Sequence, residues 1–190
     1  MDRRTALSRV ALILGGTIVG AEFFLTGCKP SDKELGTTLK FSQYDIDFLN
    51  EVAETIIPAT DTPGAKEAKV GEFMNVFVND CYDQKNQQIF LEGMKKINEI
   101  SKQKYKENFM SLSPEQRKEL LTELDKERKE YTSKKKSEDP PHYFTLIKQL
   151  TLLGYFSSEV GATKALRYVA IPGRYEGCIP YKKGDKAWAI

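Results

Sequence analysis

Residues 42–58 read SQYDIDFLNEVAETIIP, and this stretch decides the fold class. Ser42 suits a helix N-cap, because Asp45 stands three positions later and can accept a hydrogen bond from the backbone of the cap residue. The apolar side chains then recur at spacings of three and four until Pro58 stops the run. They are Ile46, Leu49, Val52, Ala53, Ile56 and Ile57. The stretch therefore predicts an amphipathic helix.

The same spacing continues along the rest of the chain, with helix starts at Thr62-Pro63, Gln84 and Ser113-Pro114. We expect further helices over 62–81, 84–109, 113–139, 143–153 and 158–166, of which 143–153 is the richest in apolar residues and is expected to be central. No strand-like alternation of any length precedes Tyr168. The prediction is an all-α fold, a single compact bundle of about five or six helices.

The segment from Arg167 to Tyr181 differs from the bundle, and Trp188 extends its character; residues 167–190 together are called the C-terminal strap. Pro and Gly recur at helix-breaking intervals, yet the segment keeps bulky aromatic side chains. Free tails are seldom this aromatic, so we expect an extended strap that packs on something. Tyr, Trp and Arg commonly anchor protein interfaces. The candidate partner-interface residues are Tyr168, Arg174, Tyr175, Tyr181 and Trp188.

The N-terminus has the features of an export signal. Arg3, Arg4 and Arg9 form a basic region, followed by an apolar stretch that is too short, and too interrupted by Glu22, for a membrane-spanning helix. The Arg3-Arg4 pair resembles a twin-arginine signal. Asp2 and Ala6 depart from that pattern, so export by the Sec pathway is the alternative.

The signal ends in a lipoprotein-type motif. The residues Leu25-Thr26-Gly27-Cys28 resemble a bacterial lipobox, in which the Cys thiol takes the lipid. We therefore predict a signal peptide over 1–27, a lipidated Cys28 with a tether over 28–40, and a helical domain over 41–190. The mature protein is expected in the bacterial cell envelope, exported and anchored to a membrane through its lipid.

Composition and motifs give no sign of chemistry in this chain. Its 190 residues contain 29 Lys and Arg against 27 Asp and Glu, a net charge of +2, which provides no long-range field to gather nucleic acid. No dinucleotide or P-loop glycine motif occurs, and three Cys with one His match no haem, zinc or iron–sulfur pattern. His142, without a nearby nucleophile, indicates a structural or surface role. We expect no catalytic, cofactor-binding or metal-binding residue.

Cys81 and Cys178 are the two thiols left after lipidation. In an oxidising envelope an even pair suggests a disulfide, which would pin the strap to the helix over 62–81. The alternative is two buried free thiols, since Cys81 also fits an apolar helix face. We favour the disulfide.

Three segments resemble a known family: ETIIPATDTPGA at 54–65, GYFSSEVGATKAL at 154–166 and PGRYEGC at 172–178. They are similar to the gluconate 2-dehydrogenase subunit 3 family, over roughly residues 41–188. The resemblance implies a small helical subunit, without catalytic residues, that accompanies a flavoprotein dehydrogenase. FAD would reside in that large subunit, and haem c in a cytochrome subunit that takes the electrons. The small subunit would carry the export signal for its partner.

Two function classes follow. The first is an accessory subunit that escorts and docks a flavin-dependent sugar or alcohol dehydrogenase. The second is a stand-alone envelope lipoprotein that binds a small ligand or another protein. The aromatic strap favours the first.

Overall fold

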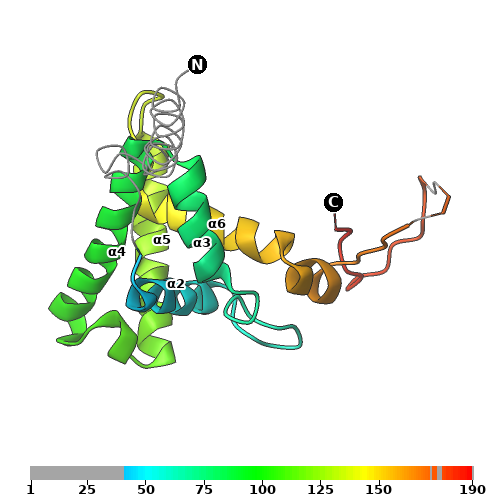
Figure 1. Cartoon of the computed structure of the whole chain (residues 1–190), viewed down its shortest axis with the longest axis horizontal. Coiled ribbons are helices and arrows are strands. Elements are labelled where there is room, and N and C mark those ends of the chain that lie inside the picture. The colour runs from blue at the N-terminus through cyan, green and yellow to red at the C-terminus, as the bar shows by residue number, and fades with distance from the viewer. Residues whose placement is uncertain (1–40, 172, 175–176, 190) are drawn as a thin grey trace, which may run out of the picture. The chain divides into compact units, whose positions relative to one another are not determined.

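The computed structural model describes residues 41–171, 173–174 and 177–189, and within them it contains helices and no strand. The all-α prediction is confirmed. The elements are α2 (Gln43–Ile56), α3 (Val70–Cys81), α4 (Gln84–Tyr105), the 3-10 turn η2 (Phe109–Ser111), α5 (Pro114–Lys134), α6 (Tyr143–Ser157) and the π-helical turn η3 (Gly161–Ala165) (Figure 1).

Two of the predicted helix starts are present as capping boxes. At α2, the Ser42 hydroxyl accepts from the Asp45 N–H at 3.2 Å, and the Asp45 carboxylate accepts from the Ser42 N–H at 2.8 Å. At α5, Ser113 and Gln116 make the same exchange, at 3.3 and 2.9 Å. These local exchanges satisfy backbone donors that the first helical turn leaves without partners.

The predicted start at Pro63 is wrong, because α3 begins at Val70. Long-range contacts keep the chain before it in a loop. The Ala65 N–H donates to the Ile57 carbonyl at 3.0 Å, and the Tyr155 hydroxyl donates to the Pro63 carbonyl at 2.6 Å. Lys69, the residue before the helix, has a left-handed backbone with φ of 53°.

Helix α6 is the central element of the bundle, as its apolar sequence predicted. It contacts α2, α3, α4 and α5 (Figure 1). Ile147, Leu150 and Tyr155 are buried, and each such side chain contributes about 1.5–3 kcal/mol through removal from water. Gly154 allows α3 to approach closely, since a Cβ there would lie 2.6 Å from the Phe73 ring.

The predicted signal peptide, the lipidated Cys28 and the tether lie outside the described residues, as does Tyr175 of the strap. Among the residues that the structure does describe, no helix has the length and apolar character needed to cross a membrane.

Candidate partner interface

The C-terminal strap is exposed along its described residues. The exposed fractions are 84% for Ile171, 77% for Tyr181, 56% for Tyr168 and 50% for Trp188. Arg174 is exposed as well. Among the described residues of the strap, Tyr168, Tyr181 and Trp188 are therefore exposed rather than buried in the core of the bundle.

The two ends of the strap are joined to each other. The Arg167 N–H donates to the Ala187 carbonyl at 2.8 Å, and the Ala189 N–H donates to the Arg167 carbonyl at 2.9 Å. The Arg167 guanidinium lies over the Trp188 ring, 4.8 Å from its centroid. This pairing closes residues 168–186 into a loop, so part of the entropy of ordering the strap is already lost in the free protein.

The second half of α6 presents an apolar face that the sequence analysis did not identify. Leu152, Leu153 and Phe156 are 41%, 47% and 42% exposed, although the first half of the same helix is buried. Their spacing of three and four residues sets them side by side on the helix. A signal existed in the sequence, since residues 146–156 carry more apolar side chains than one helix face can bury.

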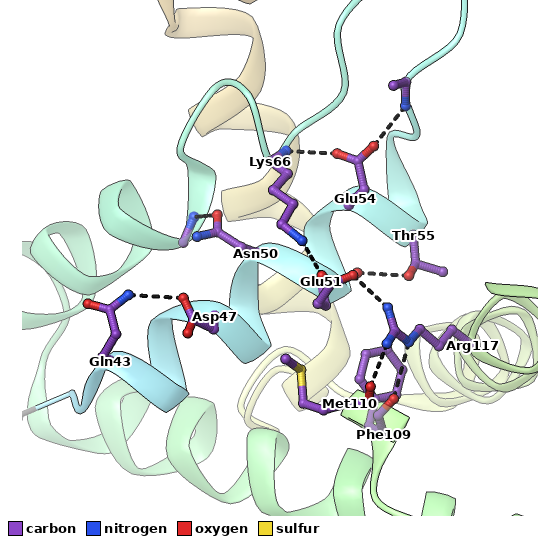
Figure 2. A network of polar contacts seen from close by, with 12 residues as sticks. Gln43, Asp47, Asn50, Glu51, Glu54, Thr55, Lys66, Phe109, Met110 and Arg117 are labelled. Atoms are coloured by element: carbon purple, nitrogen blue, oxygen red, sulfur yellow. Dashed lines mark hydrogen bonds and ion pairs between the residues drawn. The ribbon is translucent and has the colours of Figure 1, made fainter. Parts of the chain in front are cut away.

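A loop held by side-chain hydrogen bonds contacts the same half of α6. The Glu54 carboxylate accepts from the Ala59 N–H at 2.9 Å and from the Lys66 N–H at 2.8 Å, which binds both ends of the loop to α2 (Figure 2). Residues 58–61 of the loop are nevertheless exposed. The Tyr155 hydroxyl reaches the Pro63 carbonyl, so the loop is fixed to the part of α6 that carries Phe156.

Glu51 and Arg117 fix the loop-bearing helix to the rest of the bundle (Figure 2). The Arg117 guanidinium donates to the Glu51 carboxylate at 2.5 Å and to the carbonyls of Phe109 and Met110 at 3.2 and 2.6 Å. The Lys66 ammonium also donates to Glu51. A mostly buried, multiply bonded pair of this kind costs several kcal/mol to break.

Comparison with protein families gives a match to gluconate 2-dehydrogenase subunit 3, over residues 43–173. The chain belongs to this family. No curated protein and no solved structure gave a significant match. The matched region begins at the first residue of α2 and ends within the strap.

In this subunit 3 protein, two of the three segments singled out in the sequence meet in the fold. Residues 54–65 form the Glu54 loop, and residues 154–166 form the end of α6 with η3. The hydrogen bond from Tyr155 to Pro63 joins the two segments directly, although 92 positions separate them. The third segment, 172–178, lies in the strap. The family match itself spans the bundle from α2 to the first residues of the strap.

The hypothesis of a disulfide between Cys81 and Cys178 does not hold in the structure of this family member. Both thiols are free and both are exposed, so the alternative of two buried thiols is wrong as well. Cys81 is the last residue of α3, on its solvent side, and Cys178 lies in the exposed strap. The spacing of apolar residues along a helix does not determine whether the last residue of that helix faces the core or the solvent.

His142 has a structural position. It is buried at the N-cap of α6, where its Nδ1 accepts from the Phe144 N–H at 3.3 Å and its ring lies 4.3 Å from that of Tyr143. Burial, together with the nearby Glu127 carboxylate, raises the pKa of Tyr143 to about 12.

Within the described part of the chain, no cluster of three His, Cys, Asp or Glu side chains could hold a metal ion.

Proposed function

We propose that the chain is the non-catalytic small subunit of a membrane-associated, FAD-dependent sugar or alcohol dehydrogenase similar to gluconate 2-dehydrogenase. Its roles are the export, maturation and membrane docking of the catalytic flavoprotein subunit. FAD belongs to that partner and haem c to a cytochrome subunit. The predicted twin-arginine signal and the predicted lipid on Cys28 supply the route and the anchor.

One observation carries the docking role. A member of a dehydrogenase-subunit family exposes Leu152, Leu153 and Phe156 on a helix whose other large apolar side chains are buried, near a loop held in place by Glu54. Contiguous exposed apolar side chains mark a surface that binds another molecule, because water contact with them is unfavourable. A rigid loop and a central helix lose little entropy on docking.

The test is co-purification with the catalytic flavoprotein subunit of the proposed complex. We expect Phe156→Glu to weaken the complex at least tenfold, because a carboxylate would be buried without a partner in the interface. The melting temperature of the free subunit should stay within a few degrees, since Phe156 is 42% exposed.

The matched control is Tyr44→Glu. It makes the same apolar-to-acidic change at a side chain that is 53% exposed, in the first turn of α2. This control should bind the flavoprotein as the wild type does. A wild-type chain that fails to bind the flavoprotein refutes the proposal and leaves the stand-alone lipoprotein as the alternative.

A further inference from the structure

Charge is divided unequally between the bundle and the strap. Residues 167–190 contain five Lys and Arg against two acidic residues, a net charge of +3. Residues 41–166 contain 18 Lys and Arg against 21 Asp and Glu, a net charge of −3. The overall value of +2 hides this opposition. Such an asymmetry between parts of one chain indicates a charged partner for one of them.

The lysines of the strap do not use the bundle to neutralise their charge. Among the described residues, none of the three makes an ion pair with a carboxylate of the bundle. Lys182 and Lys183 are exposed. The Lys186 ammonium donates to the Lys164 carbonyl, beside the paired ends of the strap. The positive field of these lysines therefore faces solvent.

The aromatic and aliphatic side chains lie among these charges. Along the strap, basic residues are interspersed with large apolar ones. The basic residues are Arg167, Arg174 and the lysines of 182–186, and the apolar ones are Tyr168, Ile171, Tyr181 and Trp188. The described residues from 167 to 189 contain no helix, so apolar and basic side chains are not sorted onto two faces as in a helix that lies on a lipid surface. The mixture fits a protein groove that offers both carboxylates and apolar pockets.

We propose that the strap binds an acidic, apolar-pocketed groove on the flavoprotein subunit, with its lysines steering the encounter and Ile171, Tyr181 and Trp188 anchoring the complex. This inference rests on the proposed function and deepens it, because it gives the partner's receiving surface a chemical character. Electrostatic complementarity of this kind acts mainly on the rate of association and on its salt dependence.

The experiment measures association of the purified mature chain with the flavoprotein subunit at low and at physiological salt. Lys182→Glu with Lys183→Glu reverses two exposed strap charges. The control, Lys85→Glu with Lys95→Glu, makes the same change in net charge at exposed positions of α4. We expect the strap variant to associate about tenfold more slowly at low salt and to lose its salt dependence, while the control stays within about twofold of wild type.

Each other outcome has a distinct meaning. A wild type that does not bind the flavoprotein refutes the proposed function itself. Binding that is insensitive to salt, or equally affected in both variants, overturns only the acidic-groove inference. Tight binding to phosphatidylglycerol vesicles that the strap variant loses, without any effect on flavoprotein binding, would assign the strap to the membrane. A concentration-dependent dimer in sedimentation that the strap variant disperses would assign it to the negatively charged bundle of a second copy.

Discussion

At the scale of single residues, Glu54 shapes the loop between α2 and α3. Its two carboxylate oxygens accept from the backbone of Ala59 and Lys66, so one side chain satisfies two backbone donors of the loop. Gly64 makes room for it. A Cβ at position 64 would lie 2.3 Å from both carboxylate oxygens, well inside van der Waals contact.

Gly64→Ala is therefore expected to lower the free energy of unfolding by about 1–3 kcal/mol, because the carboxylate must move and release its backbone donors. Denaturant unfolding followed by circular dichroism measures this loss. In a Glu54→Ala background, where the side chain that the added methyl group would meet is gone, the same glycine substitution should cost far less. An equal loss in both backgrounds would show that the strain lies elsewhere.

The position of this loop shows where local sequence patterns end. Glu54 stands in the last turn of an amphipathic helix, where a carboxylate is ordinarily a solvated surface group, and Thr62-Pro63 has the local chemistry of a helix start. Two distant contacts give this segment a loop conformation instead. Lys66 lies 12 positions from Glu54, and Tyr155 lies 92 positions from Pro63. Contacts of that range leave no periodicity to detect.

At the scale of elements, Asp125 joins α5 to α6. Its carboxylate accepts from the Lys148 ammonium and from the Arg128 guanidinium, each at 2.8 Å, and its side chain is only 18% exposed. Burial by itself raises the pKa of Asp125, but the two hydrogen-bonded cations outweigh it and hold the pKa well below the ordinary value. The charged carboxylate thus stabilises the folded state.

A depressed carboxyl pKa contributes stability above the pKa of the unfolded state, about 4, and this contribution disappears as pH falls toward the folded-state pKa. We expect Asp125→Asn to cost about 1–2 kcal/mol at pH 7, and the difference from wild type to shrink steadily below pH 4. Thermal unfolding across pH 2–7 measures it. Glu123→Gln, at a side chain 52% exposed, is the control and should cost at most a few tenths of a kcal/mol. A difference that persists unchanged at pH 2 would contradict the assignment.

The strap is a separate element whose closure depends on Arg167 and Trp188. We expect Trp188→Ala to open the paired ends, because it removes the cation–π contact, worth about 0.5–1 kcal/mol at an exposed site. Trypsin should then cut faster after Lys182 and Lys183, while the melting temperature of the bundle changes little. Mass mapping of the early fragments checks this. Unchanged cleavage together with a large fall in melting temperature would mean that Trp188 supports the bundle instead.

Helices were predictable from this sequence to the degree that their signals are local. The caps at Ser42 and Ser113 and the apolar spacing of α2 to α6 lie within a few residues of each other, and the structure contains them. The apolar spacing at Phe156 and Cys81 could not distinguish a face buried in this chain from one left open. The periodicity of a sequence shows that one face of a helix is apolar. It does not show whether that face packs inside its own chain or against another molecule.

At the scale of the whole molecule, the residues that stabilise the fold differ from those proposed to bind the partner. The mostly buried ion pair of Glu51 and Arg117 and the core around α6 hold the bundle together. Leu152, Leu153 and Phe156 of α6 and the described residues of the strap lie outside that core. Substitutions in the second set should therefore change binding without unfolding the subunit, and this separation makes the proposed docking role testable by mutation.

Under the proposed function, transport of the complex depends on the predicted N-terminal signal rather than on the bundle. Twin-arginine export carries proteins that are already folded, so a subunit bound to a flavoprotein can bring it across the membrane. Replacing Arg3-Arg4 with Lys-Lys should leave both proteins in the cytoplasm, as measured by cell fractionation and dehydrogenase activity. Cys28→Ser should instead block lipid attachment, which mass spectrometry of the mature N-terminus detects. Normal export of the flavoprotein in a strain that lacks this chain would refute the escort role and leave docking as its remaining contribution, since docking depends on the exposed face of α6 and the strap rather than on the signal.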